Sequence, residues 1–237
     1  MDLVKENGTE YVWLADNLSA QVVKTTLDGQ HVMKLEQPEL AVYREGKYSP
    51  TSVAVNQEQH GGNGDVWVAD GYGKSYVHRY DRAGNYLGSI NGTEGAAGAF
   101  KQPHGVFVDQ RGSEPELYVA DRQNRRVQVY DLDGQFKRAV GVGFLYTPSS
   151  FITHDSWLMI VEHRASRLTV LDADDQLVCY LGENPGTEDV EGFPNISRDL
   201  HEPGRFVAPH GMAADAAGNL YVEEWLVGGR TTKLMKR

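Results

Sequence analysis

Apolar and polar residues alternate along most of this chain, with the period of two that is typical of β-strands buried on one face. The segment LYVADRQNRRVQVYDLDGQFKRAV (117–140) predicts two short strands and then a Leu-Asp-Gly turn that leads into a third strand. The same order of strands and turn recurs in residues 12–35 and 66–90, and similar copies follow in residues 158–182 and 220–237. No amphipathic helix is indicated, so the pattern predicts an all-β protein built from repeats.

Another short strand stands ahead of four of the five repeats, in the segments SPTSVAVN, QPHGVFVD, TPSSFITH and APHGMAAD. Each repeat therefore predicts a four-stranded antiparallel meander of about 40 residues, with loops of differing length. In every repeat the second strand ends in an acidic residue. These residues are Asp16, Asp70, Asp121, Glu162 and Glu224.

A four-stranded sheet cannot bury both of its faces alone, so we expect the repeats to stack around an axis as the blades of a β-propeller. A β-sandwich is the alternative. The pattern places residues 1–237 in one propeller domain with about five blades. The first repeat begins at Asp2 with no preceding Pro-His-Gly, and the last ends after its third strand. These ends favour five blades of a six-bladed ring that lacks an amino-terminal blade over a closed ring of five.

Composition and charge narrow the function classes. The 237 residues carry a net charge of −10, which argues against binding to nucleic acid or to anionic membranes. No apolar run approaches the roughly 18–20 residues that span a bilayer, and the first residues show no signal-peptide pattern. We therefore expect a soluble protein, cytoplasmic by default. The single cysteine, Cys179, excludes an internal disulfide, and its strand segment predicts that it is buried.

The tripeptide Pro-His-Gly occurs twice, each time ahead of a first strand, and supplies His104 and His210. Because neighbouring strands are antiparallel, the start of a first strand and the loop between the second and third strands lie on the same face. We therefore expect both histidines to share one rim with residues 71–76, 122–126 and 162–164. Two imidazoles on one rim could hold a metal ion such as zinc. The alternative is that each histidine only caps a neighbouring strand.

The segments PHGVFVD and LYVADRQNRRVQVYDLDG together resemble the NHL-repeat propellers, which are usually six-bladed. With VADGYGKSYVHRYDRAGNYLGSI before them and PHGMAAD and GNLYV after them, the chain is similar to the peptidyl-α-hydroxyglycine amidating lyases. The resemblance implies a zinc-dependent enzyme that cleaves a C–N bond of a peptide substrate and releases glyoxylate. It covers nearly the whole chain.

The same resemblance assigns roles to four residues. His104 and His210 match two of three zinc-binding histidines, and the third would precede residue 1. Tyr72 matches a catalytic tyrosine that takes the substrate's hydroxyl proton, and Arg122 matches an arginine that holds the substrate carboxylate. Where the family has an acidic calcium ligand this chain has Gly211, so calcium is not expected.

The residues also allow simpler interpretations. Tyr72 could be a rim aromatic between two flexible glycines, and Arg122 a surface arginine paired with Asp121 or Glu162. His163 occupies the position of Arg122 in the next repeat and could join the rim. Residues 182–206 lack periodicity and predict a long surface loop over that face, as a lid or a plain insertion.

Two other functions stay open. One is a non-catalytic NHL-type propeller that binds a protein or carbohydrate through its rim. The other is a lactone- or ester-opening propeller hydrolase. Such hydrolases use acidic and Asn ligands in a central channel, and the sequence shows no comparable set.

Overall fold

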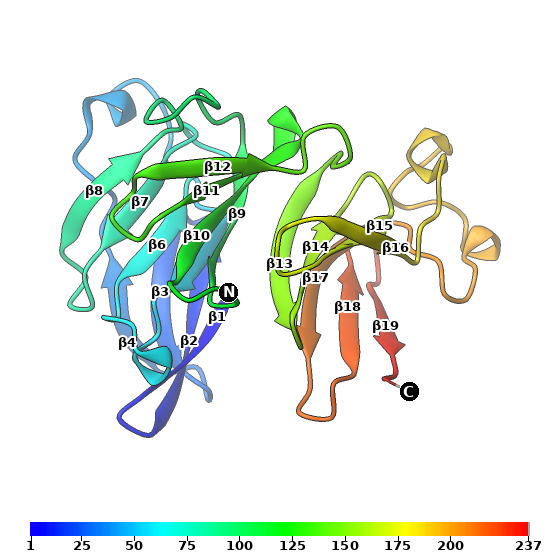
Figure 1. The fold of residues 1–237 in the computed structure, drawn as a ribbon, viewed down its shortest axis with the longest axis horizontal. Coiled ribbons are helices and arrows are strands. Elements are labelled where there is room, and N and C mark those ends of the chain that lie inside the picture. Colours follow the sequence, from blue (N-terminus) through cyan, green and yellow to red (C-terminus); the bar gives the residue numbers. More distant parts are fainter. Residues whose placement is uncertain (237) are drawn as a thin grey trace.

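The computed structural model describes residues 1–236 and contains five antiparallel sheets, which follow one another in chain order (Figure 1). Blade 1 consists of β1 (Asp2–Glu6), β2 (Thr9–Asp16), β3 (Gln21–Thr26) and β4 (His31–Leu35). Blade 2 consists of β5 (Ser52–Val55), β6 (Val66–Ala69), β7 (Val77–Tyr80) and β8 (Tyr86–Ile90). Blade 3 consists of β9 (Pro103–Asp109), β10 (Glu116–Asp121), β11 (Arg126–Tyr130) and β12 (Phe136–Val140).

Blade 4 consists of β13 (Pro148–His154), β14 (Trp157–Glu162), β15 (Arg167–Leu171) and β16 (Leu177–Leu181). Blade 5 has three strands, β17 (Pro209–Ala214), β18 (Leu220–Glu224) and β19 (Arg230–Leu234). Short 3-10 helices lie in the connections: η1 (Ala41–Tyr43), η2 (Glu58–His60), η3 (Arg122–Asn124), η4 (Thr187–Asp189) and η5 (Arg198–Leu200). In residues 1–236, no helix has the length and apolar character needed to cross a bilayer.

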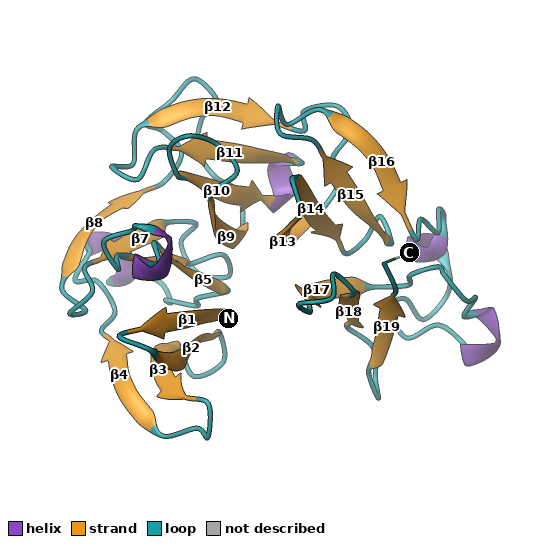
Figure 2. Cartoon of the chain, turned by 60° about the horizontal axis from the view of Figure 1, so that its bottom comes forward, coloured by secondary structure: helices purple, strands orange, loops and turns teal. Residues whose placement is uncertain are grey.

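The blades are arranged along an arc, with β1, β5, β9, β13 and β17 on its inner side and β4, β8, β12 and β16 on its outer side (Figure 2). Blades 1 and 5 stand at the two ends of this arc, and β1 and β17 belong to separate, unpaired sheets in the described part of the chain. The expected β-propeller is confirmed, and the β-sandwich alternative is wrong.

The hydrophobic core is divided among the spaces between neighbouring blades. Trp13 and Tyr80 pack between blades 1 and 2, and Trp67, Leu117 and Tyr130 pack between blades 2 and 3. One further cluster joins blade 3 to blade 4, and two join blade 4 to blade 5. Each blade therefore buries its apolar side chains against the next blade, as the period-two pattern requires.

The outermost strand of blade 4 differs from the sequence prediction. Cys179 in β16 is exposed, as are its neighbours Leu177 and Val178. The apolar run predicted burial, but a fourth strand has no further strand or sheet outside it.

Candidate active site on the propeller rim

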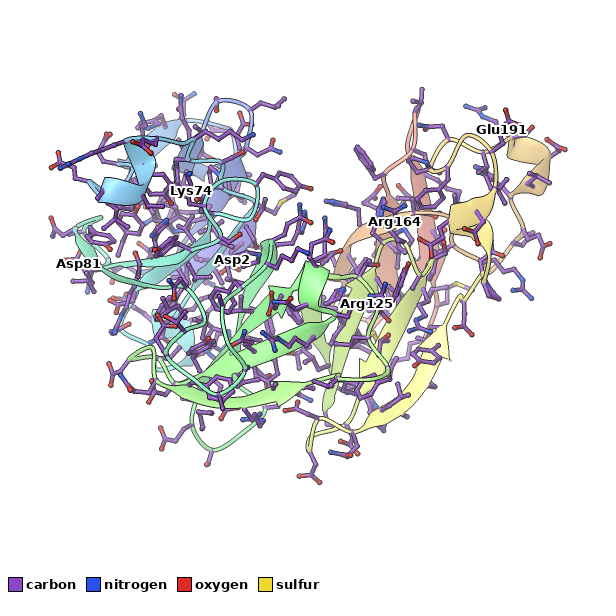
Figure 3. All side chains as sticks on the ribbon, turned by 90° about the horizontal axis from the view of Figure 1, so that it is seen from above. Asp2, Lys74, Asp81, Arg125, Arg164 and Glu191 are labelled. Carbon is purple, nitrogen blue, oxygen red and sulfur yellow. The ribbon has the colours of Figure 1, made fainter. Side chains whose placement is uncertain are left out.

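One face of the arc carries the residues singled out from the sequence. This face, called the rim, comprises the starts of β9, β13 and β17 and the loops that join second to third strands. Figure 3 looks onto the rim, where the labelled Lys74, Arg125 and Arg164 come from these loops of blades 2, 3 and 4. The tight turns between third and fourth strands lie on the face opposite the rim, as expected from the antiparallel order.

His104 and His210 start the first strands of blades 3 and 5 and meet on the rim. Their ring centroids are 5.3 Å apart and the rings are nearly perpendicular, at 86°. The proximity expected from the repeat is therefore observed.

Buried acidic residues hold these strand starts in place. Asp121, at the end of β10, accepts the backbone N–H of Lys101 at 2.8 Å and pairs with Arg126 at 2.8 Å. Glu224, at the end of β18, accepts the N–H groups of Val207 at 2.6 Å and Ala208 at 3.1 Å. Each acid thus ties the segment before the first strand to the second strand, which fixes the backbone that carries the histidine.

Blade 4 repeats this arrangement without a histidine. Glu162, at the end of β14, accepts the N–H groups of Tyr146 and Thr147 and pairs with Arg167 at 2.8 Å. The acidic positions found in the sequence are therefore structural anchors in blades 3, 4 and 5.

Tyr72 reaches His104 from the neighbouring blade. It lies in the loop between β6 and β7, and its hydroxyl oxygen is 3.1 Å from Nε2 of His104. Gly71 permits this approach, because a Cβ atom there would lie 2.3 Å from the carbonyl oxygen of Pro103. The loop can therefore rest directly on the segment that begins β9.

The tautomer of His104 follows from its second hydrogen bond. Nδ1 lies 3.1 Å from the carbonyl oxygen of Ser149. A carbonyl can only accept, so Nδ1 carries the proton and donates it. In the neutral ring, Nε2 then holds a lone pair that faces Tyr72, and the Tyr72 hydroxyl donates to it. Nε2 is the atom available to a proton or a metal.

Arg122 follows Asp121 and turns toward the same centre. Its Nη1 donates to the Tyr72 hydroxyl at 3.4 Å, and its Nη2 donates to the Ser149 hydroxyl at 2.8 Å. It does not pair with Asp121 or Glu162, the partners in the simpler interpretation, since those acids bind Arg126 and Arg167.

Arg122 is a cation without a counter-ion in the described residues. Its Nε is buried with no hydrogen-bond partner, and no carboxylate of residues 1–236 lies within ion-pair distance. Burial lowers the pKa of Arg122, although Tyr72 partly opposes this effect. A buried, unpaired guanidinium is unfavourable, so this position suits an anionic ligand.

The surroundings of the three rim histidines favour their neutral forms. Burial, aided by the positive charge of Arg122, lowers the pKa of His104 well below its ordinary value of 6.5. The same causes lower the pKa of His163 to about 4 and also lower that of His210. Neutral imidazoles can accept protons or bind metal ions.

The residues present fit a metal site only in part. A zinc–nitrogen bond is about 2.0–2.1 Å long, so two imidazoles that bind one ion must have their ligating nitrogens within about 4 Å of each other. The ring centroids of His104 and His210 are 5.3 Å apart. However, residues 1–236 contain no group of three or more His, Cys, Asp or Glu side chains arranged to hold a metal.

Sequence reasoning missed two contributors to the rim. Ser149 follows Pro148 as His104 follows Pro103, so a comparison of the strand starts could have found it. Trp225 follows Glu224 as Arg122 follows Asp121, and its ring centroid lies 5.5 Å from that of His163. His163 itself takes the position expected from the repeat, 6.0 Å from His210 between ring centroids.

The fold and the rim define a β-propeller, and segments of the chain are similar to known proteins. A 132-residue segment is 33% identical to a probable peptidyl-α-hydroxyglycine α-amidating lyase of Caenorhabditis elegans and covers 54% of this chain and 35% of that protein. A 118-residue segment is 34% identical to NHL repeat-containing protein 3 of Homo sapiens and covers 46% of this chain and 33% of that protein. These matches span about a third of the relatives' length.

Among solved structures, virginiamycin B lyase from Staphylococcus aureus is similar in fold, with a TM-score of 0.59 at 12% sequence identity. The superposition covers 98% of this chain and 68% of the lyase. At this identity the likeness supports the fold alone. No protein-family profile matches the chain. The resemblance to NHL-repeat propellers and to the amidating lyases is confirmed.

Proposed function

We propose that the rim is the active site of a lyase that cleaves the C–N bond of a peptide ending in α-hydroxyglycine. The products are the amidated peptide and glyoxylate. The observation that carries this proposal is the position of the Tyr72 hydroxyl, which contacts both Nε2 of His104 and Nη1 of Arg122. The segment shared with the amidating lyase of Caenorhabditis elegans supports it.

Arg122 and Tyr72 would act on the two polar groups of the substrate. The unpaired guanidinium of Arg122 binds the terminal carboxylate through charge-assisted hydrogen bonds. Tyr72 must first release its own proton to solvent, which frees Nε2 of His104 and leaves a phenolate whose charge Arg122, 3.4 Å away, balances. The phenolate oxygen then takes the proton of the substrate hydroxyl. The hydroxyl oxygen then forms a carbonyl as the C–N bond breaks, and the proton passes to the amide nitrogen. The atoms balance without a further reactant.

His104 and His210 are the residues that would hold zinc, with Nε2 of His104 as one ligand atom. The Nδ1 bond to the carbonyl of Ser149 would orient the ring, as such bonds do for histidine ligands. When bound, zinc would supply a Lewis acid for the substrate's hydroxyl oxygen.

Release of glyoxylate from an N-acetylated peptide ending in α-hydroxyglycine tests the proposal. We expect Tyr72→Phe to lower kcat/KM at least about 100-fold, because it removes the proton acceptor. Arg122→Gln should raise KM about tenfold or more. Tyr76→Phe is the matched control, since Tyr76 lies in the same loop but stacks on His78. An absence of glyoxylate with zinc-supplied protein, or an unaffected Tyr72→Phe variant, would refute the proposed reaction.

A non-catalytic binding propeller is the second candidate. It is favoured by Trp225, an exposed aromatic residue beside the rim histidines that a bound partner would cover. In that case the protein purifies without metal, keeps its stability and binds a partner through the rim.

A further inference from the structure

Trp225 is an exposed aromatic residue beside the rim histidines. It directly follows β18, and its backbone N–H donates to the carbonyl of Ala208 at 2.8 Å. Its side chain is 63% exposed, although its ring centroid lies only 5.5 Å from that of His163 and 6.4 Å from that of His210. A large apolar surface is thus held against the site and is not covered by any of residues 1–236.

A second aromatic side chain reaches the same place from the long loop that precedes blade 5. Phe193 lies 5.7 Å from His163 between ring centroids, in an edge-on arrangement. It packs on the buried residues Ile196, Val207 and Ala208, which form a small core of their own. The loop is therefore anchored where it meets the rim.

A hydrogen bond ties this loop to the segment that carries Trp225. The N–H of Val227 donates to the side-chain oxygen of Asn195 at 2.5 Å, and Leu226 packs with Phe193 on the same small core. Trp225 and Phe193 thus belong to one connected structure. We call these two residues and His163 the aromatic wall.

The aromatic wall faces a site whose other side is polar. Arg122 and Tyr72 lie beside His104, while Trp225 lies beyond His210. The contact between His104 and His210 connects the polar residues to the aromatic wall. A ligand that spans the imidazoles would therefore meet a cation at one end and exposed aromatic surface at the other.

We propose that the aromatic wall is a specificity subsite for an apolar, preferably aromatic, side chain next to the carboxylate-bearing end of the substrate. This inference rests on the proposed function, because it takes Arg122 as the carboxylate-binding end. A peptide with phenylalanine before its terminal residue would bury that ring against Trp225 and Phe193. Burial of the phenylalanine ring and of the wall residues away from water, with favourable ring–ring contact, makes this peptide bind more tightly than one with a small side chain at the same position.

Binding of two unreactive peptides tests the subsite without turnover. One N-acetylated peptide ends in Phe-Gly and the other in Ala-Gly, and both lack the hydroxyl that the lyase reaction needs. Isothermal titration calorimetry should give a Kd about tenfold lower for the Phe-Gly peptide. In Trp225→Ala the two values should become equal, and in Trp225→Phe most of the preference should remain.

The matched control is Trp157→Ala. Trp157 is also an exposed tryptophan, at 36%, but it begins β14, whose other end reaches the rim. We expect this variant to keep the tenfold preference. Equal binding of the two peptides by the unaltered protein, no binding of either, or a preference that survives Trp225→Ala would overturn the inference.

The test separates this inference from the lyase proposal. If the Phe-Gly preference depends on Trp225 but no hydroxyglycine peptide yields glyoxylate, the subsite stands and the reaction is wrong. If glyoxylate forms while the preference is absent, the reaction stands and the subsite is wrong.

Discussion

The two Pro-His-Gly segments, 103–105 and 209–211, have the same sequence and different surroundings. His104 is 5% exposed and bonded through both ring nitrogens, whereas His210 is only partly buried. A Cβ atom on Gly105 would lie 2.3 Å from the carbonyl oxygen of Ser149, but one on Gly211 would meet nothing within 4 Å.

The difference comes from the neighbouring blade. Beside β9 stands β13 of blade 4, whose Ser149 contacts both His104 and the backbone of Gly105. Beside β17, blade 4 lies on one side, where Ser150 donates to the carbonyl of His210 at 3.0 Å. On its other side the arc of described blades ends (Figure 2). Within residues 1–236, Gly105 is thus packed against the following blade, whereas no described residue takes the corresponding place beside Gly211.

The largest expected effect is on zinc content. If the two segments act as a pair, zinc near one equivalent in the unaltered protein should disappear in both His104→Ala and His210→Ala, because neither imidazole alone completes the site. Elemental analysis of the purified proteins measures this. Retention of zinc by His210→Ala would show that the two histidines are not partners.

Glycine substitution should separate the two segments by stability. We expect Gly105→Ala to lower the free energy of unfolding by about 1–3 kcal/mol, because its methyl group would force the backbone of Ser149 to move. Gly211→Ala should change it by no more than about 0.5 kcal/mol. Urea unfolding of both variants is the measurement. Equal effects would mean that the contact with Ser149 is not tight.

Acid titration should show the smallest contrast. In the zinc-free protein, burial lowers the folded-state pKa of His104 and of His210, so below about pH 6.5 the unfolded chain binds protons that the folded chain does not. Stability should therefore fall as the pH drops from about 6.5 toward 4. His104→Gln should flatten this fall more than His210→Gln, because His104 is the more buried.

Urea midpoints between pH 7 and pH 4.5 give the slopes. The buried His78, whose pKa is lowered to about 3 by burial, contributes equally in both variants and cancels from the difference. Identical slopes would contradict the unequal burial of the two imidazoles.

The sequence predicted those features that depend on local repetition. The blades, the acidic strand ends and the meeting of His104 with His210 all follow from strand order and from the antiparallel rule. Tyr72 and Arg122 could be placed on the rim for the same reason. Their contact depended on Gly71, whose missing side chain lets two blades touch.

The remaining parts of the site depend on contacts that leave little trace in a sequence. Ser149 orients His104 through its carbonyl oxygen, an atom that every residue type possesses. Phe193 reaches His163 from a loop with no periodicity, so no repeat predicts its position. Cys179 was predicted to be buried but is exposed, because an apolar strand can also lie at the outside of a blade.

The buried acids Asp121, Glu162 and Glu224 have one more consequence. Each uses its hydrogen bonds within its own blade, so the backbone there is already secured before the following residue contributes anything. That next residue is a guanidinium in Arg122, an imidazole in His163 and an indole in Trp225. Blades 3, 4 and 5 therefore present three different side-chain chemistries toward a common centre from one equivalent position of the same scaffold.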